Sequence, residues 1–157
     1  MEVLFLCSGN IVRSPLAEGL LRKILSEIGV KNVIVSSAGT LGIRGQPASV
    51  EAVRIATQRG FDLRHHRSRG VTERLIRHAD LIVVMERAHL RKVTEIDMLA
   101  VPRTHLLAEY EAGAERAAAF DVPDPIAGTP ELNDRVFAII DRCVVNLAFD
   151  LKYQTAS

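Results

Sequence analysis

Residues 3–15 read Val-Leu-Phe-Leu-Cys-Ser-Gly-Asn-Ile-Val-Arg-Ser-Pro, a stretch that predicts a buried strand, a short loop and the start of a helix. Its first four residues form an apolar run that is too short for a helix and suits a parallel strand covered on both faces. Ser14 and Pro15 are typical of a helix start, with serine at the N-cap and proline at the first helical position. Between strand and helix, Gly9 and Asn10 tolerate the unusual backbone conformations that a tight turn requires.

A loop that leads into a helix N-terminus directs several backbone N–H groups into one concavity and adds the positive end of the helix dipole. We therefore expect this loop to bind an anion. Arg13 supplies a planar fork of donors that matches a phosphate, and the positive field favours a thiolate at Cys7, which is a nucleophile for a bound phosphorus. The predicted phosphate-binding loop comprises Ser8, Gly9, Asn10, Ile11, Val12, Arg13 and Ser14.

The competing interpretation makes Cys7 an apolar core residue and Arg13 an ordinary surface charge. The Gly-Asn and Ser-Pro pairs that flank the two residues favour the catalytic interpretation.

Further along the chain, short apolar runs alternate with helical patterns. Strands are expected at 33–35 and 79–85 and within 99–107, with Pro102 indicating an edge position for the last of them. Helices are expected over 16–28, 48–59, 87–96 and 106–119, and from Thr129-Pro130 onward. This alternation predicts an α/β fold: a small doubly wound four-stranded parallel sheet flanked by helices, a flavodoxin-like three-layer α/β/α arrangement. Ligands of such sheets bind at the carboxyl ends of the strands, where Cys7 lies.

Composition excludes several classes of protein. The 157 residues are 48% apolar and 25% charged with a net charge of +1, which gives no reason to expect a nucleic-acid or membrane partner. The length suits one domain, and we expect a monomer or weak dimer. Two cysteines do not make a disulfide framework, and a nucleophilic Cys7 needs a reducing compartment, so the expected location is cytoplasmic. Cys143 lies on the apolar face of the last helix, where a packing role is expected.

Attack of a thiolate on a phosphate monoester expels a leaving group that needs a proton, so a carboxylic acid is expected nearby. Asp121 and Asp124 are the candidates, because both lie in the proline-containing loop over 120–128. Asp124 is favoured, although an aspartate before a proline also serves simply to begin a turn.

The segment from Asp62 to Arg77 is strongly basic, with Arg64, His65, His66, Arg67, Arg69, Arg74 and Arg77. It is either an electropositive rim that steers phosphorylated substrates or a solvated face. The adjacent pair of histidines lacks a third ligand at metal spacing, so no metal site is expected.

A cysteine followed, after five residues, by an arginine and a serine resembles the protein tyrosine phosphatase signature. Its position near the N-terminus resembles the low-molecular-weight protein tyrosine phosphatase family, and the likeness extends over nearly the full length. Further landmarks of this resemblance are Ser37-Ala38-Gly39-Thr40, Gly45-Gln46-Pro47-Ala48, His66-Arg67-Ser68-Arg69, Asp80-Leu81-Ile82, Met85-Glu86 and Asp124-Pro125.

The resemblance implies a single phosphatase domain over residues 1–157 that hydrolyses phosphotyrosine proteins or aryl phosphates through a phosphocysteine and releases inorganic phosphate. In that mechanism Cys7 carries the phosphoryl group, Arg13 binds it and Asp124 is the acid. No metal or cofactor is implied, because loop amides and the arginine supply the electrostatics.

The resemblance also assigns supporting roles. Asn10 and Ser14 brace the loop, and Ser14 in addition stabilises the Cys7 thiolate. Ser37 is expected to form a hydrogen bond with Asn10.

Two departures from the family pattern keep alternatives open. Val12 stands where many members carry a second cysteine, so Cys7 is expected to over-oxidise easily. Ile126 stands where many carry an aromatic residue, which leaves a protein arginine phosphatase as the main alternative, although such enzymes tend to carry a small polar residue in place of Ile11. An arsenate reductase needs additional reactive cysteines, and Cys143 is expected to be buried. A non-catalytic phosphate-binding module is disfavoured because nucleophile, arginine and acid are all present.

Overall fold

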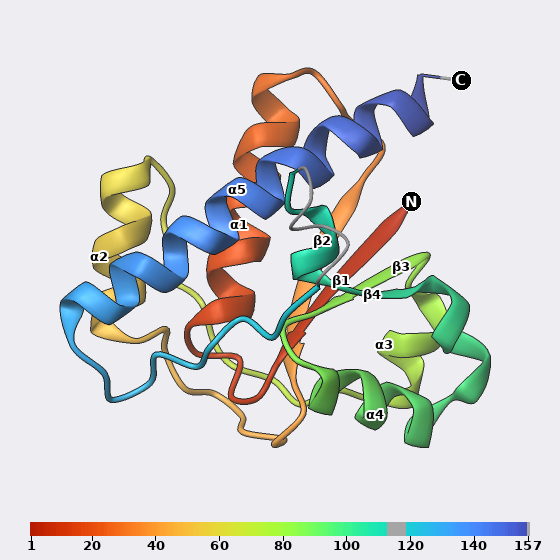
Figure 1. Ribbon diagram of the computed structural model, residues 1–157, viewed down its shortest axis with the longest axis horizontal. Helices are drawn as coiled ribbons and strands as arrows, with labels where there is room; N and C mark the ends of the chain where they lie inside the picture. Colours follow the sequence, from red (N-terminus) through yellow and green to blue (C-terminus); the bar gives the residue numbers. More distant parts are fainter. Residues whose placement is uncertain (113–118, 157) are drawn as a thin grey trace.

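The computed structural model describes residues 1–112 and 119–156, and it contains a four-stranded parallel sheet between two layers of helices (Figure 1). The strands follow the order β2-β1-β3-β4, so β4 lies at an edge as expected. Their bounds are Glu2–Cys7 for β1, Ile34–Gly39 for β2, Leu81–Val84 for β3 and Thr104–Leu106 for β4. The predicted α/β class and the four parallel strands are confirmed.

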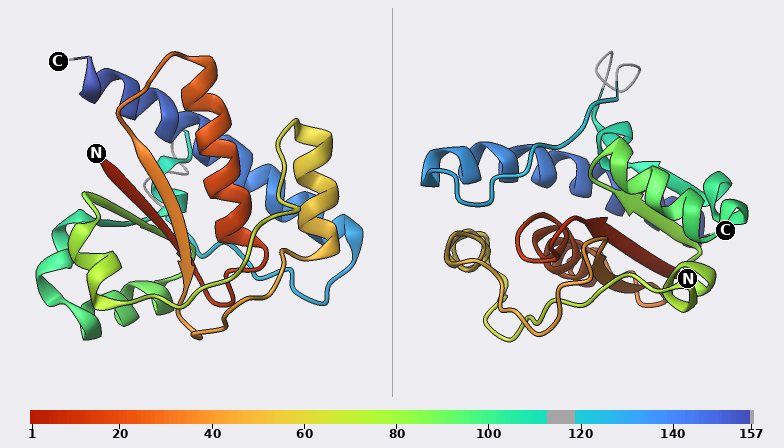
Figure 2. Two further views of the ribbon diagram at one scale, coloured as in Figure 1. Left: turned by 180° about the vertical axis from the view of Figure 1, so that it is seen from behind. Right: turned by 90° about the horizontal axis from the view of Figure 1, so that it is seen from below.

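The apolar run of β1 is buried on both faces because helices cover both sides of the sheet. Val3 and Phe5 pack in the cluster formed with α1 (Arg13–Glu27) and α5 (Pro130–Thr155). Leu4 and Leu6 pack in the opposite cluster, formed with α3 (Glu73–His78) and α4 (Arg87–Ile96). The view from below shows the strands between these two helical layers (Figure 2). Helix α2 (Val50–Arg59) contacts α1 and α5 beside the sheet.

Several predicted boundaries agree with the structure. Helix α4 spans the predicted residues, and α2 ends at Gly60, whose φ of 96° is left-handed backbone that favours glycine. Helix α5 begins at Pro130, with the Thr129 hydroxyl accepting the Leu132 N–H at 3.1 Å. Cys143 is fully buried on α5, and burial raises the pKa of its thiol to about 12, in agreement with a packing role.

Three predictions of local structure were wrong or incomplete. Helix α1 begins at Arg13, and Ser14 is not its N-cap, because the serine hydroxyl contacts the Cys7 sulfur instead. The helix predicted over 106–119 is a 3₁₀ turn, η2 (Leu107–Tyr110), followed by two non-helical residues; residues 113–118 of that prediction lie outside the described part of the chain. The basic segment contains α3, a helix not predicted, which begins where the Thr72 hydroxyl accepts the Leu75 N–H.

The chain enters β4 through a second 3₁₀ segment, η1 (Met98–Arg103), which contains Pro102 and packs beside α4. Within residues 1–112 and 119–156, no helix combines the length and apolar character needed to cross a membrane.

Candidate active site

Cys7 is the last residue of β1, and its sulfur lies under the loop that leads into α1. Its side chain is 2% exposed, and Sγ lies 2.9 Å from the Ser14 hydroxyl and 3.3 Å from the Asn10 nitrogen, whose N–H donates to it. The loop and the start of the helix therefore enclose the sulfur with donors. A small pocket of about 110 Å³ opens onto this sulfur and onto the loop, including Ser8, Gly9 and Arg13.

Asn10 holds the loop in shape. It is fully buried and has a φ of 57°, left-handed backbone that asparagine tolerates better than most residues. Its Nδ2 group donates to the hydroxyls of Ser14 and Ser37, both at 2.9 Å, and its Oδ1 accepts the Arg69 N–H at 3.0 Å. These three bonds use both N–H donors of the side-chain amide and one acceptor position of its oxygen, and they fix the orientation of the amide.

The same network sets the direction of the Ser14 hydroxyl. Since Ser14 Oγ already accepts from Asn10, its own hydrogen is available for the Cys7 sulfur, and a thiolate accepts but does not donate. On the other side of Asn10, the Ser37 hydroxyl donates to the Glu18 carboxylate. The chain of bonds thus runs from Glu18 on α1 to the Cys7 sulfur and directs the Ser14 hydroxyl hydrogen at it.

Two further residues brace the loop from neighbouring segments. His66 donates its Nε2–H to the Asn10 carbonyl oxygen at 2.7 Å. Gly39 lies against the loop at the end of β2, where an added Cβ would lie 2.7 Å from the Ser8 carbonyl oxygen and 3.0 Å from the Asn10 nitrogen. Because both are backbone atoms, any side chain at residue 39 would displace the loop.

Arg13 is buried and has fixed partners on one side of its guanidinium. Nη1 donates to the Glu86 carboxylate and to the Val122 carbonyl oxygen, both at 2.8 Å. Nη2 lies 3.4 Å from the Ser8 hydroxyl and 3.3 Å from Asp124 Oδ2. Glu86 therefore aims the guanidinium, and the Nη2 side faces the pocket that contains Cys7.

His89 determines how the Ser8 hydroxyl is oriented. Its Nδ1 accepts the Glu86 N–H at 3.1 Å, so the hydrogen of the neutral ring lies on Nε2 and is donated to Ser8 Oγ at 2.9 Å. The ring stays neutral because burial, followed by the positive charge of Arg13, lowers the pKa of His89 to about 4. Ser8 Oγ thus accepts from both His89 and Arg13, and its own hydrogen is left to donate into the phosphate pocket that Ser8 lines.

The two candidate acids occupy different places. Asp124 lines the pocket with Cys7, pairs with Arg13 and accepts the Ile126 N–H at 3.1 Å. Asp121 instead accepts the Arg87 N–H at 2.8 Å at the start of α4 and does not line the pocket. Of these two candidates, the structure brings Asp124, and not Asp121, to the pocket with Cys7 and Arg13.

The mouth of the pocket is aliphatic. It is formed by Ile11, Leu41, Ile43 and Ile126, of which Leu41 is 68% exposed and Ile126 52% exposed. A volume of about 110 Å³ is well below the ~300–1,000 Å³ that encloses a drug-sized ligand. The pocket accordingly has room for a small group only, and exposed aliphatic side chains surround its opening.

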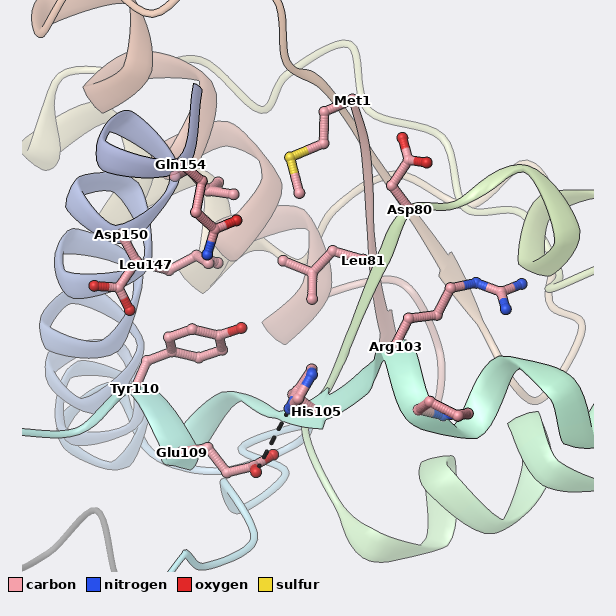
Figure 3. A pocket seen from close by; sticks show the side chains of 12 residues that line it. Met1, Asp80, Leu81, Arg103, His105, Glu109, Tyr110, Leu147, Asp150 and Gln154 are labelled. Atoms are coloured by element: carbon pink, nitrogen blue, oxygen red, sulfur yellow. Dashed lines mark ion pairs between the residues drawn. The ribbon is translucent and has the colours of Figure 1, made fainter. Parts of the chain in front are cut away.

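A larger hollow of about 560 Å³ lies at the opposite end of the strands, between α5, β4 and η2 (Figure 3). Three of the ionisable side chains that line it are already engaged: His105 pairs with Glu109 at 3.6 Å, and Arg103 donates to the carbonyl oxygens of Ala79, Leu99 and Ile76. It contains neither cysteine of the chain. This hollow therefore lacks the chemistry expected for the reaction, and the site is the pocket at Cys7.

The basic segment contributes in two ways. His66 and the Arg69 backbone brace the loop, whereas Arg64 pairs with Asp62 and Arg77 pairs with Glu73 at the surface. Among the described residues, no three His, Cys, Asp or Glu side chains are grouped as metal ligands.

Sequence patterns did not assign roles to Glu18, Glu86 and His89, although each belongs to the site. The local sequence indicated only that Glu86 directly follows the strand predicted over 79–85 and that His89 comes one helical turn later. This spacing places the two side chains on one face.

An α/β chain that carries a cysteine and an arginine on one anion-binding loop, at the carboxyl end of a parallel sheet, has the architecture of a cysteine-dependent phosphatase. The chain matches the low molecular weight phosphotyrosine protein phosphatase family over residues 2–157, and it belongs to this family.

Known relatives include phosphatases for two types of phosphorylated residue. The chain is 34% identical over 141 residues to the low molecular weight protein-tyrosine-phosphatase Etp of Escherichia coli K12, covering 90% of this chain and 88% of Etp. Wzb of Vibrio vulnificus, solved in complex with benzylphosphonate, is 30% identical, with a TM-score of 0.84 over 95% of this chain and 97% of Wzb. A mutant of the YwlE arginine phosphatase with a phosphorylated active-site serine is also 30% identical, with a TM-score of 0.87 over 97% of this chain and 96% of that one.

Proposed function

We propose that this enzyme hydrolyses phosphotyrosine in proteins, or related aryl phosphates, through a phosphocysteine at Cys7. The observation that carries the proposal is that the sulfur of Cys7, the Nη2 side of Arg13 and the carboxyl group of Asp124 share one small pocket. A nucleophile, an anion-binding fork and a proton donor are the groups that phosphate transfer to sulfur requires.

In the first step, the loop N–H groups and Arg13 bind the oxygens of the phosphoryl group. The Cys7 thiolate attacks phosphorus, a sulfur–phosphorus bond forms, and the bond from phosphorus to the leaving oxygen breaks. Asp124 donates its proton to that oxygen, so that a neutral phenol leaves. The phosphoryl dianion competes with Asp124 for Arg13, which frees the carboxyl group to turn to the leaving oxygen.

In the second step, Asp124 accepts a proton from a water molecule whose oxygen attacks phosphorus. The sulfur–phosphorus bond breaks, inorganic phosphate forms and the thiolate returns. The Ser14 hydroxyl assists this departure, because it donates to the sulfur that regains negative charge. The phosphorylated serine in the YwlE mutant supports a nucleophile at this place in the fold.

The aliphatic mouth favours an aromatic substrate. Ile11, Leu41 and Ile126 offer apolar contact to a flat phenyl ring, and the pocket lining includes one carboxylate, Asp124, as a partner for a cationic group. Hydrolysis of phosphoarginine remains the second candidate, because the YwlE relative covers nearly the whole chain and Ile126 replaces the expected aromatic residue.

The test is hydrolysis of phosphotyrosine and phosphoarginine side by side in EDTA, with Cys7→Ala as the control. Cys7→Ser is unsuitable, since the serine of the YwlE mutant was itself phosphorylated. Turnover of phosphotyrosine that disappears in the alanine variant supports the proposal. Preference for phosphoarginine overturns the substrate class, and activity that survives in Cys7→Ala overturns the nucleophile.

We further propose that residues 1–157 act as one catalytic domain, a monomer or weak dimer, in the cytoplasm. The match over residues 2–157 supports the first point, and the need to keep Cys7 reduced supports the last.

A further inference from the structure

Another hollow, of about 690 Å³, lies next to the pocket at Cys7. The loop that contains Ile43 and Arg44 separates the two. The loop is held by hydrogen bonds at 2.8 Å between the Gly45 N–H and the Ser68 carbonyl oxygen and between the Ser68 N–H and the Gln46 carbonyl oxygen. Ile43 lines the phosphate pocket, and its neighbour Arg44 lines the second hollow. The back view shows the segment around Gly45 and the segment around Ser68 beside each other near the carboxyl end of β2 (Figure 2).

Positive charge dominates this second hollow. Arg44, Arg69 and Arg74 line it, and Glu2 is the one acidic residue among the described residues of its lining. We call this hollow, defined by those three arginines, the arginine groove. The arginine groove extends from Arg44 to His78 at the end of α3, so it leads away from the pocket at Cys7.

Two arginines of the groove differ from the surface arginines nearby. Arg64 and Arg77 are paired with Asp62 and Glu73. Among the described residues, by contrast, no carboxylate pairs with Arg44 or Arg74. Arg69 uses Nε to donate to the Ser37 carbonyl oxygen at 3.0 Å, which fixes the side chain and leaves its two terminal nitrogens for another acceptor. Guanidinium groups of this kind match carboxylates in a planar, two-bond geometry.

We propose that the arginine groove binds an acidic segment of the phosphorylated protein substrate, close in sequence to the phosphorylated residue. The proposal rests on the phosphatase function proposed above and names the substrate class more closely. An extended chain advances ~3.3–3.6 Å per residue, so carboxylates a few residues from the phosphorylated side chain can follow the groove. Exposed ion pairs act mainly on the capture of the substrate. The preference for acidic peptides should therefore appear as a lower KM and become weaker as the salt concentration rises.

The test uses two phosphotyrosine peptides of equal length, one with Asp and Glu and the other with Asn and Gln at two to six residues on either side of the phosphotyrosine. The double variant Arg44→Gln/Arg74→Gln removes two of the three arginine charges of the groove and keeps Arg69, whose backbone braces the phosphate-binding loop. The matched control is Arg91→Gln/Arg135→Gln, which removes the same charge from exposed arginines that line neither the groove nor the phosphate pocket.

We expect the acidic peptide to have the higher kcat/KM in the parent enzyme. In the groove variant this value should fall roughly 3- to 30-fold, as expected for two exposed ion pairs, with kcat unchanged. The neutral peptide, free phosphotyrosine and the control variant should keep their values. Equal kcat/KM for the two peptides in the parent enzyme, or an equal loss for both in the groove variant, overturns the proposal.

A binding measurement separates this proposal from the function on which it rests. Fluorescence anisotropy of the labelled peptides on Cys7→Ala reports groove affinity without turnover, and the acidic peptide should bind more tightly by the same factor. Failure of the parent enzyme to hydrolyse free phosphotyrosine would instead contradict the proposed phosphatase function. Binding to phosphatidylserine vesicles that needs Arg44 and Arg74, without preference between the peptides, would assign the groove to a membrane surface and overturn the proposal.

Discussion

Replacing Asn10 by glycine and by alanine separates two contributions to the phosphate-binding loop. Glycine removes the three side-chain hydrogen bonds but accepts the φ of 57°, whereas alanine removes the same bonds and adds strain. At ~0.5–1.5 kcal/mol for each bond, the loss is about 1.5–4.5 kcal/mol, so kcat/KM of Asn10→Gly should fall by roughly 10²-fold. Left-handed backbone costs alanine a further ~1–2 kcal/mol, so Asn10→Ala should lose roughly another 5- to 30-fold.

The assay is kcat/KM on an aryl phosphate in EDTA, with the free energy of unfolding measured in urea to confirm that each variant is folded. Ala127 provides the calibration, because it has a φ of 56° outside the phosphate loop. Ala127→Gly therefore measures how glycine and alanine differ at such a backbone without the three hydrogen bonds. Equal or higher kcat/KM for Asn10→Ala than for Asn10→Gly would refute the role of the left-handed backbone, and parental activity in Asn10→Gly would refute the role of the side chain.

Three further changes test other parts of the site. Asp124→Ala should lose at least ~10²-fold in kcat on substrates with poor leaving groups, whereas Asp121→Ala, the matched control, should not; normal turnover by the Asp124 variant would move the acid elsewhere. Burial lowers the pKa of His89 to about 4, so the unfolded chain binds a proton below pH 6.5 that the folded protein excludes, and the resulting stability is complete above pH 6.5 and is lost as the pH falls toward 4. His89→Gln should therefore flatten the acid-induced fall in the free energy of unfolding by up to roughly 3 kcal/mol between pH 7 and pH 4, and an unchanged pH dependence in urea titrations would contradict this. Peroxide should inactivate Cys7 with poor recovery in dithiothreitol, because Val12 offers no thiol to trap the oxidised sulfur; full recovery of activity would argue against this.

The sheet and the phosphate-binding loop could be predicted from the sequence because both depend on local patterns of residues. Apolar runs of strand length predicted the strands, and the residues between Cys7 and Ser14 predicted an anion site at the correct end of β1. Ser14 shows the limit of such rules. A serine before a proline is typical of an N-cap, but here the hydroxyl satisfies Asn10 and the Cys7 sulfur, and the helix begins at Arg13, two residues before the predicted first position at Pro15.

The supporting residues of the site depend on strand order, which no local pattern specifies. Glu86 and His89 reach Arg13 and Ser8 because β3 is the neighbour of β1 in the sheet. Their contacts join segments more than seventy residues apart, so the neighbouring sequence indicates only that the two side chains share one face and not what they contact. The same holds for the Arg69 backbone, which reaches Asn10 from a segment that composition alone described only as basic.

The phosphocysteine is tested most directly by trapping the phosphorylated enzyme. Parent enzyme is mixed with an aryl phosphate, quenched in acid within the first turnover and mapped by mass spectrometry under conditions that preserve thiophosphate. The proposed mechanism requires one phosphoryl group on the peptide that contains Cys7, lost as inorganic phosphate is released and absent from Cys7→Ala. A phosphoryl group on any other residue, or turnover with no phosphorylated enzyme at any time, would contradict it.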